Sequence, residues 1–149
     1  MSTEMANPVN WVLVFHLAGM VFWIGGLFVA MAAAGASAFA GPAGAEAGAK
    51  AVRARLARQG MSTYAHPGAA IMVLTGALLM YLMPGLRTAG WLHAKLGLVV
   101  VLIVFDVALT LEVWRMPDRE VPNPRLGIFH GTISLLFLLI LILVLTKPF

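Results

Sequence analysis

Six ionisable side chains stand in stretches of this chain that are otherwise apolar, and they are the groups that could do chemistry. They are all four histidines, one lysine and one aspartate: His16, His66, His93, Lys95, Asp106 and His130. Imidazole binds haem iron and other transition metals, and carboxylates bind metals or carry protons. Because an ionisable group inside an apolar membrane helix is costly, each one is a candidate functional residue.

The surroundings of these residues predict an integral membrane protein. The 149 residues are 61% hydrophobic and 11% charged, whereas soluble domains carry about 25% charged residues. A helix needs about 20 apolar residues to span a bilayer. We therefore predict a single all-α transmembrane domain over 1–149, an up-down bundle of four helices at about 11–34, 66–83, 91–114 and 126–145.

The loops predict an orientation in the membrane. Basic residues gather in the first and third loops, at Lys50, Arg53, Arg55, Arg58, Arg115, Arg119 and Arg125. The opposite side has Arg87 in its loop and Lys147 at the C-terminus. The positive-inside rule then places both termini outside the cytoplasm. We expect the basic, helix-prone piece at 50–58 to lie along the membrane surface, with disorder as the alternative.

Several classes of protein are excluded by composition. The chain has no cysteine, which excludes disulfides, thiolate metal sites and thiol catalysis. Its net charge of +4 is spread over short loops, which argues against nucleic-acid binding. The start of the chain has Glu4 and no basic residue, so we expect no cleavable signal peptide.

His16 is the leading candidate for a cofactor ligand. Met20 and Trp23 follow it at helical spacing, so the three residues share one stripe of the first helix. Three glycines, Gly19, Gly25 and Gly26, would allow close approach of a helix or a flat cofactor. His16 is either an axial ligand of haem iron or a histidine hydrogen-bonded to a neighbouring helix. A copper site of His16 and Met20 is more weakly supported.

His93 and Lys95 open the third helix on the outer side and project from opposite faces. Lys95 could neutralise a carboxylate, such as a porphyrin propionate, or could snorkel to the interface. His93 could be a ligand or a proton carrier, or it could simply be hydrated at the interface.

Asp106 lies about 16 Å below Lys95 on nearly the same face of the third helix. The candidate partners are His66, His130 and Arg115 on the inner side. Two histidines and a carboxylate could bind a metal ion, a proton relay is an alternative, and a plain interhelical hydrogen bond is the third possibility. His66 and His130 could also sit hydrated at the interface.

Four motifs in order resemble the HemJ type of protoporphyrinogen oxidase and its wider relatives, which include the membrane domain of CopD copper-resistance proteins. The motifs are HLAGMVFWIGGLF at 16–28, Pro67 with Gly76, GWLHAKL at 90–96, and the terminal KPF at 147–149. The chain departs from the family at Phe105-Asp106, where the family has Tyr-His, and at His130-Gly131, where it has Asn-Glu.

The resemblance implies a four-helix protein of the bacterial inner membrane that binds haem b. His16 would be the axial ligand, and Lys95 would be a functional group near the site. The implied reaction is oxidation of protoporphyrinogen IX to protoporphyrin IX, with electrons leaving through haem to quinone. The alternatives are a CopD-like protein that binds or transports copper and a non-catalytic subunit that holds haem for electron transfer. The Gly- and Ala-rich faces of the first helix would also allow a homodimer.

Overall fold

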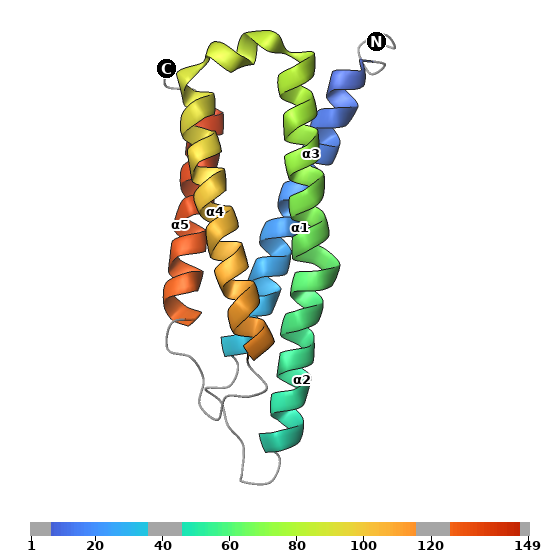
Figure 1. The fold of residues 1–149 in the computed structure, drawn as a ribbon, viewed down its shortest axis with the longest axis vertical. Helices are drawn as coiled ribbons and strands as arrows, with labels where there is room; N and C mark the ends of the chain where they lie inside the picture. The colour runs from blue at the N-terminus through green and yellow to red at the C-terminus, as the bar shows by residue number, and fades with distance from the viewer. Residues whose placement is uncertain (1–6, 36–45, 116–125, 147–149) are drawn as a thin grey trace.

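A computed structural model describes residues 7–35, 46–115 and 126–146, apart from the side chains at 46, 47, 86 and 87. All regular secondary structure in these residues is helical (Figure 1). Four helices of the described part are long and apolar enough to cross a bilayer: Pro8–Gly35, Gly48–Leu82, Gly90–Arg115 and Leu126–Thr146. The predicted class, an all-α four-helix membrane bundle, is confirmed.

The helix ends lie close to the predicted ones. The helices are α1 (Pro8–Gly35), α2 (Glu46–Gln59), α3 (His66–Leu82), α4 (Gly90–Arg115) and α5 (Leu126–Thr146). A short 3-10 helix, Pro84–Thr88, joins α3 to α4 where the Pro-Gly pair predicted a turn. Arg119, Arg125, the terminal KPF motif and most of the Ala- and Gly-rich first loop lie outside the described residues.

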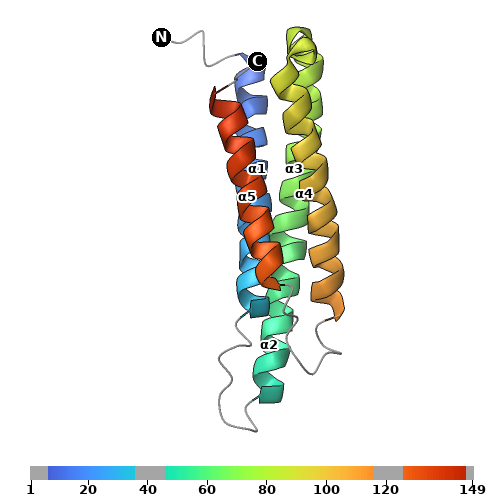
Figure 2. The ribbon, with the colours of Figure 1, turned by 90° about the vertical axis from the view of Figure 1, so that its left-hand side faces the viewer.

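The prediction that the basic piece at 50–58 lies along the membrane surface is wrong. Instead α2 continues through one π-helical turn, Gly60–Ala65, directly into α3, and the three segments form one long rod (Figures 1 and 2). The backbone N–H of His66 donates to the carbonyl of Met61, as the wider turn requires. Pro67 accounts for this irregularity, because its ring would press on the carbonyl of Thr63 in a regular α-helix.

The rod packs antiparallel against α1, and α4 packs against α5, with α1 also contacting α5. Helix α1 begins and α5 ends at the same end of the bundle, which we call the outer end (Figure 1). The core where α1, α4 and α5 meet consists of large buried side chains, among them Trp23, Leu27, Leu102, Leu109 and Ile133. At the opposite, inner end, Arg58 of α2 donates to the Trp114 carbonyl over 3.2 Å and lies 5.1 Å above its ring.

Glycines bring α1 and α3 into backbone contact. A Cβ on Gly19 would lie 2.7 Å from the backbone nitrogen of Met72, and a Cβ on Gly26 or Gly68 would overlap the backbone of Ala65 or Trp23. Small residues allow such an approach, which van der Waals packing stabilises in a lipid environment. Gly19 and Gly26 of α1 are therefore covered by the rod, whereas Gly25 stays exposed among the described residues. The homodimer remains a prediction, and the crossing aims His16 at α3.

Candidate functional site

Two groups of residues that surround polar atoms lie at different depths of the bundle. The outer site consists of His16, Met72, Thr75, Gly76 and Lys95. The inner site consists of Trp23, His66, Asp106 and Thr110. His16 and Trp23 are seven residues apart on α1, which separates the two sites by about 10 Å along the helix axis.

Hydrogen bonds fix the tautomer of His16 in the outer site. Its Nδ1 lies 2.9 Å from the carbonyl oxygen of Met72, so this nitrogen must carry a proton and donate. The hydroxyl oxygen of Thr75 lies 3.1 Å from the same nitrogen, and its own proton goes to the Ile71 carbonyl over 2.6 Å. A neutral His16 therefore keeps its lone pair on Nε2.

The ring of His16 is buried against one turn of α3. Only 8% of the residue is exposed. A Cβ added to Gly76 would lie 3.1 Å from the ring carbon Cε1, so the glycine makes room for the imidazole. Lys95 of α4 is half-buried and close enough to act electrostatically on His16. Histidine ligands of metals usually donate a hydrogen bond from the ring nitrogen that does not bind the metal, as Nδ1 of His16 does here.

The other residues predicted near His16 have different surroundings. Trp23 is fully buried and hydrogen-bonded in the inner site, and Met20 is half-buried and packs against the apolar core. His93 is exposed at the outer end of α4, with its Nδ1 3.1 Å from the carbonyl oxygen of Ala89 in the preceding turn. Lys95 is the predicted residue whose charge acts on His16.

In the inner site, Asp106 of α4 faces Trp23 of α1. The indole Nε1–H donates to Oδ2 of the carboxyl group over 3.0 Å. Trp23 has no exposed surface, so its N–H needs an acceptor inside the bundle, and Asp106 supplies one. The second oxygen, Oδ1, is buried without a hydrogen-bond partner in the described part of the chain.

His66 approaches the free oxygen of Asp106 from the rod. Its Nε2 lies 4.0 Å from Oδ1, beyond hydrogen-bond reach, and 3.1 Å from the hydroxyl oxygen of Thr110. The Thr110 hydroxyl donates to the Asp106 carbonyl over 2.8 Å, so it accepts from His66 Nε2–H. The His66 side chain is 45% exposed and that of Asp106 is 9% exposed, so the pair joins an exposed group to a buried one.

The described residues do not form the metal site that was predicted from Asp106 and two histidines. His130 of α5 lies against Phe28, with ring centroids 5.4 Å apart, rather than beside Asp106. Arg115 is exposed at the inner end of α4. Within the described ranges no three His, Asp or Glu side chains gather as metal ligands would. Of the three predicted partners, only His66 faces Asp106.

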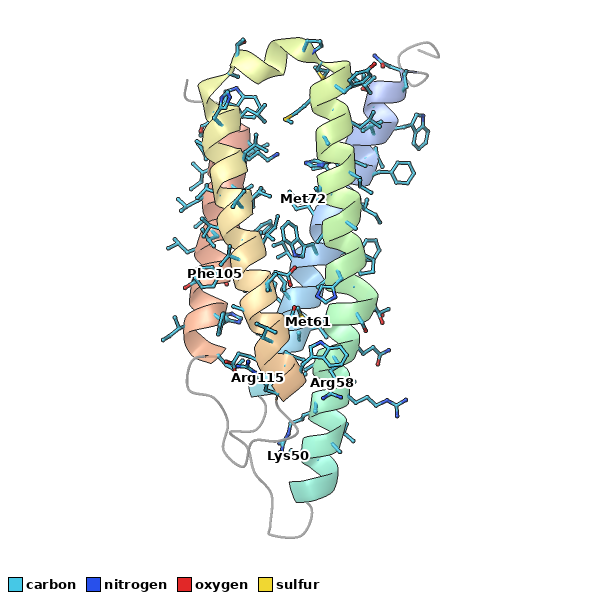
Figure 3. The ribbon with its side chains drawn as sticks, in the orientation of Figure 1. Lys50, Arg58, Met61, Met72, Phe105 and Arg115 are labelled. Atoms are coloured by element: carbon cyan, nitrogen blue, oxygen red, sulfur yellow. The ribbon has the colours of Figure 1, made fainter. Side chains whose placement is uncertain are left out.

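Three functional candidates were missed in the sequence: Met72 through its carbonyl, Thr75 and Thr110. A signal for Thr75 was available, since it lies seven residues from the outer end of α3 and His16 lies eight from the outer end of α1. Equal depth on antiparallel helices places them side by side. Figure 3 shows Met72 and Met61 on the rod and Phe105 across the bundle on α4.

The chain is similar to curated proteins named protoporphyrinogen IX oxidase. It is 37% identical over 93 residues to the protein of Helicobacter pylori strain ATCC 700392 / 26695. It is 34% identical over 93 residues to that of strain J99 / ATCC 700824. Each match covers 59% of this chain and 62% of the relative. This similarity confirms the resemblance that the motifs carry.

Two further comparisons give no match. No protein-family model matches the chain, and no solved structure matches it.

Proposed function

We propose that this protein is a haem-b-binding membrane oxidoreductase that oxidises protoporphyrinogen IX to protoporphyrin IX and passes the electrons towards quinone. Two observations support the proposal. The similar bacterial proteins carry the name of this activity. The outer site holds a buried imidazole whose Nδ1 is tied to a backbone carbonyl, so that Nε2 is left as a ligand atom.

The residues of the outer site fit a haem. His16 would bind the haem iron through Nε2, and its hydrogen bond to the Met72 carbonyl would hold the ring and raise its basicity. Lys95 offers a cation to a propionate in a half-buried position, where a charge-assisted contact is stronger than at a free surface. When bound, the haem would supply a one-electron acceptor within the bilayer.

Visible spectroscopy of the purified protein tests the cofactor. We expect a reduced-minus-oxidised spectrum with sharp b-type bands, and we expect His16→Ala to abolish them while the protein still inserts. Imidazole added to His16→Gly should restore part of the spectrum. His93→Ala is the matched control, because His93 is also an outer-end histidine but is exposed, and it should keep its haem.

Three results would change the assignment. Full haem in His16→Ala would remove His16 as the ligand. Loss of haem in both histidine variants would make His93 a ligand as well. A colourless protein that binds copper would favour the CopD-like alternative.

The activity is tested with protoporphyrinogen IX in membranes that lack another oxidase for it. We expect anaerobic, quinone-dependent formation of fluorescent protoporphyrin IX, and a loss of at least tenfold in His16→Ala. Lys95→Met should lower haem or substrate affinity more than Lys95→Arg does, because arginine keeps the charge. Normal haem with no porphyrin formation would indicate a haem-holding electron-transfer subunit instead.

We place the protein in the bacterial inner membrane with both termini outside the cytoplasm. Lys50, Arg58 and Arg115 lie toward the inner end of the bundle, opposite the end where α1 begins and α5 ends (Figure 3). Such a basic end faces the cytoplasm in most membrane proteins. A phosphatase fused to the C-terminus should be active, and a C-terminal reporter active only in the cytoplasm would reverse the orientation.

A further inference from the structure

We propose that Asp106 and His66 form a proton site in which Asp106 stores a proton inside the membrane and exchanges it with water through His66. This site is separate from the haem site proposed at His16 and does not depend on it. The two residues come from different helices, and the bundle brings them together at the level of the π-helical turn.

The geometry around Asp106 leaves one oxygen available for a proton. Oδ2 already accepts the indole N–H of Trp23, whereas Oδ1 is buried without a partner among the described residues. A carboxylate oxygen left without a donor in an apolar medium costs free energy that a bound proton removes. Oδ1 is therefore the atom that takes up the proton.

His66 is the titratable group that faces this oxygen. Helix α1 contributes the neutral indole of Trp23, and α4 itself contributes the Thr110 hydroxyl. The His66 side chain is 45% exposed at the surface of the bundle, and in the proposal its second nitrogen exchanges protons with water on the inner side. His66 thus bridges the aqueous phase and a side chain that is more than nine-tenths buried.

Transfer requires a small movement of His66. Its Nε2 must approach Oδ1 from 4.0 Å to about 2.7–3.2 Å, the range of an N–H···O hydrogen bond. In the step, the Nε2–H bond of the imidazolium breaks and an O–H bond forms at Oδ1. The ion pair becomes a neutral pair, and the reverse step returns the proton to His66 and then to water. Thr110 holds the ring beside Oδ1 between transfers.

Infrared spectroscopy of the full-length protein tests this proposal directly. The chain has two aspartates, Asp106 and Asp118, so selective carbon-13 labelling of aspartate reduces the carboxyl signals to two. We expect a C=O band of a protonated, buried carboxyl group that exchanges with deuterium. Asp106→Asn should remove the band, and the matched variant Asp118→Asn should keep it.

The relay is tested by the rate of that exchange. His66→Gln should slow hydrogen–deuterium exchange at Asp106 by at least tenfold and shift the midpoint pH of the band. Imidazole in the buffer should restore the rate in His66→Gly, because the position is exposed. A purely structural pair would show no rescue by imidazole.

Two outcomes would overturn the inference. One is a labelled protein with no protonated Asp106 at any pH at which it stays folded. The other is an exchange rate unchanged by His66→Gln. Both measurements are made without substrate and without reference to haem, so they hold or fail independently of the His16 experiments.

Discussion

In both the outer and the inner site, a hydrogen bond holds one atom of a functional group while a second atom of that group is left for other chemistry. The held atom is a donor in the outer site and an acceptor in the inner site. At the outer site an imidazole donates from Nδ1 and keeps a lone pair on Nε2. At the inner site a carboxyl group accepts at Oδ2, and its Oδ1 has no hydrogen-bond partner among the described residues. The first arrangement suits a metal centre that needs a fixed ligand. The second suits a proton that must come and go.

The sites also differ in how exposed their side chains are. His16 is buried and its ring is wedged against Gly76, so its position is fixed by packing. Asp106 is equally buried, but its neighbour His66 is exposed and stands beyond hydrogen-bond distance. We therefore expect rigidity to matter at the outer site and mobility of one side chain to matter at the inner site.

The largest effect should come from breaking the helix crossing that supports both sites. Gly26→Ala would force a Cβ into the backbone of Ala65. We expect a loss of more than about 3 kcal/mol, beyond the usual range for overpacking, because backbone rather than a side chain must move. Thermal unfolding in detergent and haem content should both fall.

The neighbouring Gly25 is the matched control, since an added Cβ there meets no atom of the described residues within 4 Å. Gly25→Ala should behave like the parent protein. Equal stability of the two variants would mean that the backbone contact contributes nothing.

The next largest effect should be confined to the inner site and should leave the outer site unchanged. Trp23→Phe removes the indole N–H and leaves both oxygens of Asp106 without a donor, which should cost about 1–3 kcal/mol. The cost should shrink in the background of Asp106→Leu, because no buried acceptor is then left unpaired. Haem content should stay within twofold of the parent; a loss as complete as in His16→Ala would place Trp23 at the cofactor.

A smaller effect should be confined to the outer site. Gly76→Ala places a methyl group 3.1 Å from Cε1 of His16. Because the ring must then shift by a few tenths of an ångström, we expect a several-fold weaker haem affinity and a displaced absorption band. Stability should be unchanged or higher, since alanine favours the helix over glycine by about 0.5–1 kcal/mol. Gly97→Ala, in open space on α4, is the control.

The smallest effect should spare both sites. Arg58→Ala removes the contact with the Trp114 ring and the hydrogen bond to its carbonyl at the inner end. We expect a loss of about 0.5–1 kcal/mol of stability with normal haem and normal exchange at Asp106. Arg58→Lys should recover part of the lost stability. A change in either site would show that α2 is coupled to the bundle interior.

The sequence pointed to ionisable side chains that the structure buries, but it was less informative about their partners. His16 and Asp106 were identified because an ionisable group in an apolar helix needs a reason to be there. Their surroundings required distances between helices, which helical periodicity within one segment does not contain. Trp23 was therefore grouped with His16, seven residues away on the same stripe, although its hydrogen bond goes to Asp106, eighty-three residues away.

The sequence alone determined the class of fold, the helices of α1, α3, α4 and α5, and the ionisable residues that are candidates for chemistry. It could do so because a bilayer demands about 20 apolar residues per span and penalises each charge. Tertiary structure decided which nitrogen of His16 is hydrogen-bonded and which oxygen of Asp106 accepts from Trp23. It also decided that the basic piece forms α2 and extends the rod. Those outcomes depend on contacts across the bundle. The decisive ones are the glycine crossing of α1 with α3 and the π-helical turn before Pro67.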